Sequence, residues 1–585
     1  MHPRITLAAL SMAALCGASF ALPAAERDFV PVTDEMLRNP DPADWLMWRR
    51  TLDGWGYSPL DAIHRGNVAR LALAWTHDLE PGPSQEGVPL VYDGVMYVPN
   101  PLDVTEALDA ATGERIWRHA RDLPDDVGQY VPFPHTNRNL AIYDRLIIDN
   151  GSDDYVYALD ARTGELVWET RIFDYKTNPA KQGSAPFVAN GKLISGRNCM
   201  PQGGPETCVI TAHDALTGKE LWRKRTIPRP GEPGGDSWGD VPDAARWHVG
   251  AWLIPSYDPE LDLVYIGTSV TAPAPKFMLA GNEHQYLYHN STLALDPDTG
   301  ETRWYYQHLV DHWDLDHPFE RLLIDTAVAP NPDEVPWMNP RLRPGERRRV
   351  VTGIPGKTGI VYTLDRATGE FLWARPTITQ NVVADIDGAT GKVTVNPEKV
   401  FTAANQEVFV CPTTNGGKNW PAGAYSPRTG LMYFPLQNTC MTTRSIAEEA
   451  TPEMVYAINN STVITPGEEG VGTIRAVAVA TGEASWRYDQ RTGVGALLAT
   501  GGDLVFGGDV GGKFRALDAV TGEVLWETDL GSEVTGHPIT FAVGGRQYVA
   551  VTTGTSNMTG ALARLTPDER AAKRENKLFV FALPE

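Results

Sequence analysis

The sequence predicts an all-β protein, an eight-bladed β-propeller with tryptophan-docking repeats. The first observation behind this prediction is the stretch LDAVTGEVLW, which reads as a strand end, a tight turn and a new strand closing on Trp526. Asp518 can bond forward to the turn backbone, and Gly522 can take the positive φ that a residue with a Cβ resists. A tryptophan that locks each hairpin to its neighbour is typical of propellers.

The second observation is that the pattern Asp-x-x-Thr-Gly-x-x-x-Trp recurs along the chain. Further copies end at Trp117, Trp168, Trp222, Trp304 and Trp373, and a copy with Ala478 in place of Asp ends at Trp486. The interval between Trp373 and Trp486 is the longest and can hold an additional blade, with 424–433 as its degenerate turn. We therefore expect eight blades, with the C-terminal LFVFAL and the early strand ending at Trp75 sharing one blade and closing the ring.

The N-terminus predicts export. Residues 1–25 combine a short basic start, an apolar run and small residues, which is typical of a cleaved secretory signal peptide. No other stretch is apolar enough to cross a bilayer. We expect residues 26–585 to form a single periplasmic propeller domain, whose one convincing short helix covers 567–573.

Composition excludes some classes of partner. The formal net charge is -22, so nucleic acids and anionic membranes, whose phosphates would be repelled, are not expected as general partners. The basic stretch 341–349 is either a docking loop for a carrier or, as we favour, a solvated loop.

Four cysteines remain after removal of the signal peptide. In an oxidising compartment their nearness in sequence favours the disulfides Cys199–Cys208 and Cys411–Cys440, although four cysteines allow three pairings. The chain contains no Cys-x-x-Cys-His, so covalently attached haem is not expected.

The segment with the highest density of polar residues is Asp311-His-Trp-Asp-Leu-Asp-His317. In an extended segment Asp314 and Asp316 lie on the same side, so both carboxylates can reach one hard cation. One of them can equally serve as a general base. The alternative is that the segment is a solvated turn without a functional role, because carboxylates are mostly surface groups.

The segment 311–317 resembles the quinoprotein alcohol dehydrogenases, as do the repeats, the export signal and the segment 49–59, RRTLDGWGYSP. That family binds pyrroloquinoline quinone (PQQ) in an eight-bladed propeller, and the resemblance covers nearly all of the mature chain. It implies that Asp314 is the catalytic base.

The resemblance also implies a set of cofactor-binding residues. They are Glu86, Arg138, Ser184, Trp252, Lys357, Asn419 and Trp420. A planar tricarboxylate quinone needs aromatic stacking, cations for its carboxylates and a cation beside the carbonyl that receives hydride. Taken singly, each residue has a plainer reading as a surface ion pair, a core aromatic or a turn cation; their order along the chain favours the cofactor site.

The sequence departs from the family at three places. Pro132 and Phe133 stand where adjacent cysteines usually lie beside the cofactor. The usual metal-binding Asn is missing from 267–271, and Gly203 falls at the place of the metal-binding Glu, which leaves Glu206 as the nearest substitute.

Asp316 bears on the metal. In this family a second Asp two residues after the base marks members that use a lanthanide, whereas calcium-using members usually have a neutral residue there. The additional carboxylate suits a trivalent ion. The expected metal ligands are therefore Asp314, Asp316 and Glu206, with a lanthanide or calcium ion.

Two functions from different classes follow. The first is an exported PQQ-dependent dehydrogenase that oxidises an alcohol to an aldehyde or ketone and passes electrons to a separate acceptor such as a cytochrome c. The second is a non-catalytic propeller scaffold of the outer-membrane assembly type. A scaffold has no need of Glu86, Arg138, Trp252, Lys357 and Asp314 together, so these residues favour the enzyme.

Overall fold

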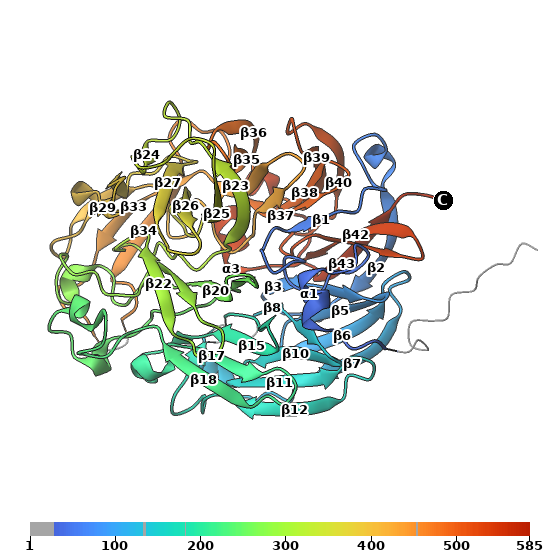
Figure 1. Ribbon diagram of the computed structural model, residues 1–585, viewed down its shortest axis with the longest axis horizontal. Coiled ribbons are helices and arrows are strands. Elements are labelled where there is room, and N and C mark those ends of the chain that lie inside the picture. The colour runs from blue at the N-terminus through green and yellow to red at the C-terminus, as the bar shows by residue number, and fades with distance from the viewer. Residues whose placement is uncertain (1–28, 133–135, 182, 452–453) are drawn as a thin grey trace, which may run out of the picture.

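A computed structural model describes residues 29–132, 136–181, 183–451 and 454–585. Its sheets are arranged around a common centre, in chain order from blue to red (Figure 1). The prediction of an all-β propeller is confirmed. The predicted signal peptide, residues 1–25, lies outside the described residues.

Eight sheets of four or five strands follow one another along the described chain. The first four sheets are β4 (Leu90–Tyr92), β5 (Val95–Asn100), β6 (Val104–Asp109) and β7 (Arg115–Ala120); β9 (Ala141–Tyr143), β10 (Leu146–Gly151), β11 (Tyr155–Asp160) and β12 (Leu166–Arg171); β14 (Phe187–Ala189), β15 (Lys192–Gly196), β17 (Val209–Asp214) and β18 (Glu220–Arg225); and β19 (Ser256–Asp258), β20 (Leu263–Gly267), β21 (Ser291–Leu295) and β22 (Thr302–Gln307). The fifth and sixth are β23 (Leu322–Val328), β25 (Glu346–Gly353), β26 (Ile360–Asp365), β27 (Phe371–Pro376) and β24 (Trp337–Met338); and β31 (Ala424–Ser426), β32 (Leu431–Gln437), β35 (Gly472–Ala478) and β36 (Ala484–Gln490). The seventh and eighth are β1 (Tyr57–Ser58), β37 (Val494–Thr500), β38 (Leu504–Asp509), β39 (Lys513–Asp518) and β40 (Val524–Asp529); and β41 (Ile539–Val543), β42 (Arg546–Thr553), β43 (Lys577–Ala582) and β2 (Ala72–Asp78).

The last sheet joins the two ends of the chain. Strand β43 lies between β42 and β2, so an N-terminal strand completes the C-terminal blade, as the sequence predicts. Figure 1 shows blue β2 beside red β43. The predicted turn at 424–433 also lies between two paired strands, β31 and β32.

The repeat fixes the contact between neighbouring blades. At the turn before Trp526, the Asp518 side chain accepts hydrogen bonds from the N–H groups of Val520 and Thr521, and Gly522 has φ +76°. A Cβ on Gly522 would lie 2.6 Å from the ring of Trp486, which belongs to the preceding blade. Only a residue without a side chain lets the indole lie flat on the turn.

The same tryptophan–glycine contact recurs around the ring. A Cβ on the turn glycine would meet the ring of the preceding blade's tryptophan in the pairs Trp75–Gly113, Trp117–Gly164, Trp168–Gly218, Trp222–Gly300, Trp304–Gly369, Trp373–Gly482 and Trp486–Gly522. The remaining junction is made by Trp526, whose Nε1 donates to the carbonyl of Leu71 just before β2. The pattern recognised in the sequence is therefore the interface between blades.

Smaller sheets and helices lie between the blades. The sheets are β3 (Gln85–Val88) with β8 (Asn137–Asn139), β13 (Ala180–Lys181) with β16 (Asn198–Cys199), β28 (Val383–Ile386) with β29 (Val393–Val395), and β30 (Glu407–Val410) with β33 (Thr439–Ser445) and β34 (Ile458–Ile464). The α-helices of the described residues are α1 (Asp34–Arg38), α2 (Val127–Tyr130) and α3 (Asn557–Ala563).

The predicted helix at 567–573 is wrong in extent. Only Pro567–Glu569 form a 3₁₀ turn, and the longer helix α3 precedes it. Ser556 and Thr559 form reciprocal capping hydrogen bonds that start α3. This Ser/Thr pair is a variant of the usual capping box, so the start was easy to overlook.

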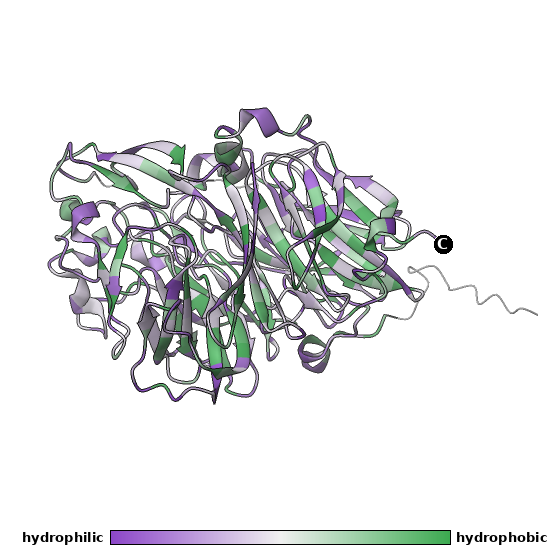
Figure 2. Ribbon diagram, turned by 90° about the horizontal axis from the view of Figure 1, so that it is seen from above, coloured by the Kyte–Doolittle hydropathy of each residue, from purple (hydrophilic) through white to green (hydrophobic). Residues whose placement is uncertain are grey.

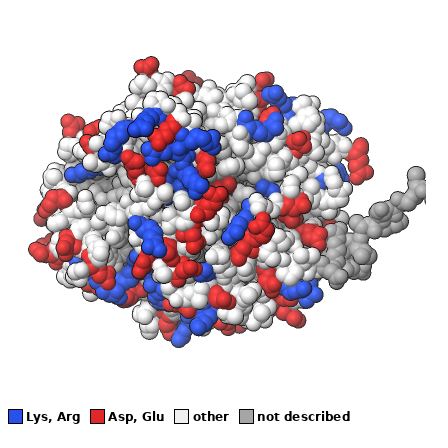
Figure 3. Space-filling model, in the orientation of Figure 1, with Lys and Arg blue, Asp and Glu red and all other residues white. Residues whose placement is uncertain are grey.

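The surface carries both signs of charge. Apolar residues concentrate along the strands, and hydrophilic ones lie at the edges and loops (Figure 2). Figure 3 shows Lys and Arg gathered over one part of the face that carries β23–β25. There Arg341, Arg348 and Arg349 pair with acidic neighbours, which fits the solvated alternative for 341–349. In the described part of the chain, no helix has the length and apolarity needed to span a membrane.

The blade contact can be tested with two glycines of nearly equal φ. Gly164 has φ +71° and faces Trp117, whereas Gly430 has φ +68° with no atom within 4 Å of an added Cβ. We expect Gly430→Ala to cost about 1–2 kcal/mol of unfolding free energy, from the left-handed backbone alone. Gly164→Ala adds overpacking against the indole, typically another ~1–3 kcal/mol. Denaturant unfolding measures both, and equal losses would contradict the docking role.

Candidate functional site

Most of the predicted site residues line one cavity. Its volume is about 490 Å³, and its walls include Glu86, Arg138, Trp252, Asp314, Asp316, Lys357, Asn419 and Trp420. Most of these side chains come from segments just before the first strand of a blade, so loops from several blades converge there. Two larger cavities, of about 840 and 830 Å³, are lined by none of the predicted residues.

One wall holds an ion pair beside an indole. β3 and β8 run parallel and carry Glu86 and Arg138, whose side chains lie 2.8 Å apart. Arg138 also donates to the carbonyl of Gly183 at 2.8 Å, and its guanidinium carbon lies 5.3 Å from the ring centroid of Trp252. Phe319 packs edge-on against the same indole. The wall thus offers a fixed cation and a supported flat ring.

Another part of the wall is a turn organised by Asp311. Its buried carboxylate accepts hydrogen bonds from the N–H groups of Trp313, Asp314 and Leu315, at 2.8 to 3.2 Å. The apolar side chains of Trp313 and Leu315 are fully buried, and Asp314 has φ +78°. The segment is therefore not the extended strand that the alternation argument assumes, yet Asp314 and Asp316 both face the cavity.

Lys357 bridges the two carboxylates. Its Nζ lies 3.0 Å from Asp314 Oδ1 and 3.2 Å from Asp316 Oδ2. It also donates to the Asp314 carbonyl, and its backbone N–H donates to the Asp316 carbonyl. The other oxygen of Asp316, Oδ1, accepts from the N–H of Val270 at 3.0 Å. The segment 267–271, which lacks the family's usual Asn, therefore supports Asp316 through its backbone.

Burial and mutual charge tune these groups differently. Burial raises the pKa of Asp314 to about 7, and Asp316 adds to the rise while Lys357 opposes it. Burial acts in the same direction on Asp316, but Lys357 and the Val270 N–H hold its pKa below the ordinary value. Burial would lower the pKa of Lys357, and the two carboxylates outweigh it and raise that pKa. Of the two carboxyls, Asp314 is the one whose environment suits proton exchange near neutrality.

Asn419 and Trp420 complete the cavity wall before β31. The Asn419 amide donates to the Asn415 carbonyl at 2.8 Å, and Trp420 packs against His537. The preceding Lys418 points away into the core, where it pairs with Glu320 at 2.6 Å. Lys418 therefore lies in the core, whereas the side chains of Asn419 and Trp420 line the cavity.

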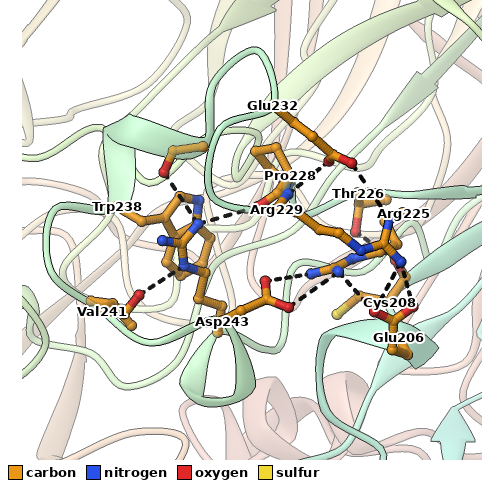
Figure 4. Close-up of polar contacts among 12 residues, drawn as sticks. Glu206, Cys208, Arg225, Thr226, Pro228, Arg229, Glu232, Trp238, Val241 and Asp243 are labelled. Atoms are coloured by element: carbon orange, nitrogen blue, oxygen red, sulfur yellow. Dashed lines mark hydrogen bonds and ion pairs between the residues drawn. The ribbon is translucent and has the colours of Figure 1, made fainter.

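Two predicted residues lie elsewhere. Ser184 does not line the cavity; its buried hydroxyl contacts the carbonyls of Ala185 and Leu253. Glu206 is exposed and pairs with Arg225 at 2.8 Å and Arg229 at 3.0 Å (Figure 4). The expectation that Glu206 substitutes for the metal-binding Glu is therefore corrected, because two arginines hold its carboxylate outside the cavity.

The disulfides follow sequence nearness. Cys199 is bonded to Cys208, and Cys411 to Cys440. The first closes the short loop that carries Glu206 and anchors β16 beside the cavity. Pro132 lines the cavity where the family usually has a cysteine, whereas Phe133 lies outside the described residues.

Several side chains at the cavity were not found by sequence reasoning, and three of them bear on the chemistry or the wall of the site. Asn198, the first residue of β16, is largely buried, and its Oδ1 has no hydrogen-bond partner among the described residues. Tyr456 donates its hydroxyl proton to Asp314 Oδ1 at 2.9 Å. Met558 comes from α3. None stands in a recognisable motif; the one available signal was that Asn198 directly precedes a disulfide cysteine.

The acidic groups do not form a complete metal cage. Within the described residues, no group of three or more His, Cys, Asp and Glu side chains is placed to hold one ion. Asp314 and Asp316 supply two carboxylates, and the unpartnered Asn198 oxygen lies at the same cavity. Any cation there needs further ligands from a bound cofactor or water.

The loops of this propeller converge on buried cations, paired carboxylates and an indole. These features are those of the cofactor-binding β-propeller enzymes. The family model described as "PQQ: Glucose/ethanol/alcohol dehydrogenase, beta-propeller domain" matches residues 45–394 and 455–549. The chain belongs to this family.

Characterised relatives cover almost the whole chain. The dehydrogenase subunit of alcohol dehydrogenase (quinone) from Komagataeibacter europaeus is 32% identical over 96% of this chain and 79% of its own length. The crystal structure of quinohemoprotein alcohol dehydrogenase from Comamonas testosteroni has a TM-score of 0.83 at 28% identity, covering 96% of this chain and 84% of its own. A europium-containing methanol dehydrogenase has a TM-score of 0.82 at 26% identity, covering 94% and 100%.

The new position of Glu206 can be tested by metal analysis. We expect Glu206→Gln to leave the metal content of the purified protein unchanged, because the carboxylate is paired with Arg225 and Arg229 outside the cavity. Glu232→Gln is the matched control, since Glu232 pairs with the same Arg229. Elemental analysis of both variants decides the point, and loss of metal in Glu206→Gln alone would return Glu206 to the ligand set.

Proposed function

We propose that this protein is a PQQ-dependent dehydrogenase that oxidises an alcohol to an aldehyde or ketone. The observation that carries the proposal is the convergence of Arg138, Trp252, Lys357 and Asp314 on one cavity. These groups provide what a planar, anionic quinone needs: a flat aromatic surface, a cation for a carboxylate and a second cation beside the reacting carbonyl. Membership of the PQQ family supports the same reading.

The residues present fit the cofactor. The Nε atom of Arg138 and the Oδ1 atom of Asn198 are buried without partners among the described residues, so polar capacity remains at the cavity. The residues that would hold the quinone are Glu86, Arg138, Trp252, Asn419 and Trp420. Bound PQQ supplies the acceptor for the hydride of the alcohol carbon.

Asp314 performs the proton chemistry in this proposal. Its carboxylate accepts the proton of the alcohol hydroxyl, and its raised pKa suits that exchange. Lys357 donates a hydrogen bond to Oδ1 of this carboxyl group. Trp252, Trp420 and Met558 give this part of the cavity an apolar lining.

The scaffold alternative lacks a supporting observation. Lys357, Asp314, Asp316, Arg138 and Glu86 are charged groups removed from much of the solvent, and desolvating charges is costly. A propeller that only presents its rim to partners has no use for this arrangement.

We also propose a metal at the cavity, held by Asp314 and Asp316, with Asn198 as a third ligand and the remaining ligands from the cofactor or water. A lanthanide is favoured over calcium because two carboxylates two residues apart, both facing the cavity, suit a trivalent charge. The structural likeness to a europium-containing methanol dehydrogenase supports this preference. The present contacts of Asp316 with Lys357 and Val270 are the alternative use of that carboxylate.

The remaining proposals concern cellular context. The N-terminal residues 1–25 resemble a signal peptide, so we propose a periplasmic location. We also propose that the electrons pass to a separate acceptor such as a cytochrome c.

The base is tested by Asp314→Asn. The amide is nearly isosteric but cannot take a proton, so we expect a loss of about 10²–10⁴-fold in kcat. The assay is dye-linked alcohol oxidation after reconstitution with PQQ and either calcium or a lanthanide, with PQQ binding followed by absorbance as the control. Near-native turnover in a fully loaded variant would remove Asp314 from this role.

The metal proposal is tested by Asp316→Ala. Loss of one carboxylate weakens the binding of a trivalent ion more than that of a divalent ion. We therefore expect lanthanum-dependent activity to fall far more than calcium-dependent activity. Apo-protein is titrated with PQQ and each metal, and bound metal is counted. Equal activation by both metals, unaltered in the variant, would show that Asp316 serves only its local contacts.

A further inference from the structure

Tyr456 meets the candidate base from a distant part of the chain. It lies on the connection between β33 and β34, which belong to a small sheet outside the blades. Its hydroxyl donates to Asp314 Oδ1 at 2.9 Å. Its ring lines the same cavity and packs edge-on against His248, with centroids 5.8 Å apart. A hydrogen bond to a carboxylate from a half-buried phenol is both directional and strong.

The backbone around Tyr456 is held in place. Val455 accepts a hydrogen bond from the N–H of Ala274 at 3.0 Å, and Ala457 donates to the carbonyl of Ala274 at 2.8 Å. These two bonds form a parallel bridge that ties the connection to the segment between β20 and β21. Ala457 also accepts a bond from the N–H of Ile446, at the end of its own hairpin. The phenol is therefore presented by anchored backbone at both ends.

The contacts distinguish the two oxygens of Asp314. Oδ1 accepts from both Lys357 Nζ, at 3.0 Å, and Tyr456, at 2.9 Å. Across the described residues, no donor bonds to Oδ2. A carboxylate held by two donors on one oxygen cannot rotate freely, and its second oxygen keeps a fixed direction.

We infer that Tyr456 is a positioning residue that, with Lys357, fixes Oδ1 of Asp314 and leaves Oδ2 as the oxygen that takes the alcohol proton. This inference rests on the proposed function. Lys357 alone supplies one bond about which the carboxyl group can swing, and the phenol removes that freedom. The benefit is geometric, because small misplacements of a reacting group can lower the rate of a positioned reaction about 10²-fold.

The test is Tyr456→Phe in the PQQ- and metal-loaded protein. The variant retains the ring and the cavity wall and loses only the hydroxyl. We expect kcat to fall by about 10–100-fold, with KM changed less than about three-fold and PQQ binding unchanged, because alignment rather than binding is lost. Tyr265→Phe is the matched control; its buried hydroxyl bonds the carbonyl of Arg366 away from the cavity, and its kinetics should equal those of the wild type.

A second readout does not depend on turnover. Crystal structures of the PQQ-free wild type and Tyr456→Phe should show one Asp314 side-chain conformer in the wild type and more than one in the variant. A single unchanged conformer together with unchanged kcat would overturn the inference. If the wild type itself oxidises no alcohol, the proposed function fails, and the Asp314 conformers alone then decide whether Tyr456 positions this carboxylate.

Discussion

The contact of a tryptophan ring with the turn glycine of the next blade is the constraint on which the structure depends. At each of these turns an added Cβ would lie 2.4 to 3.2 Å from the indole, so neighbouring blades approach this closely only when the turn residue is glycine. The contact recurs at seven junctions, and the hydrogen bond from Trp526 to Leu71 makes the eighth. With β2 and β43 in one sheet, the ring has no unpaired junction in its described part. Loops from distant parts of the sequence are thereby held at fixed distances from one another.

The cavity uses that rigidity to keep charges in place. Asp311 shapes the turn, Lys357 joins Asp314 to Asp316, and Arg138 pairs with Glu86 beside Trp252. Such pairs contribute little net stability once desolvation is counted, and removing one partner leaves an expensive buried charge. The arrangement is better explained by chemistry than by stability. Its two carboxylates have opposite pKa shifts, which is the pattern expected of groups with different roles.

The fold was predictable because its information is local and repeated. The turn Asp, the Gly and the closing Trp lie within ten residues, so one copy defines a hairpin and seven define a propeller. The site was predictable in part. Five residues lie in segments that resemble the family and line one cavity: Glu86, Arg138, Trp252, Asp314 and Lys357. Glu206 was misplaced because its sequence neighbours gave no sign of Arg225 and Arg229. Asn198 and Tyr456 were missed because their contacts arise from insertions that meet only in three dimensions.

The central claim is that this cavity oxidises an alcohol with PQQ. The most direct measurement is a single turnover: protein loaded with PQQ and metal is mixed with alcohol in the absence of oxygen and of any electron acceptor. Our account predicts about one aldehyde or ketone formed per bound PQQ, because one cofactor accepts one hydride. Stoichiometric PQQ binding without any product, over a range of primary and secondary alcohols, would contradict it.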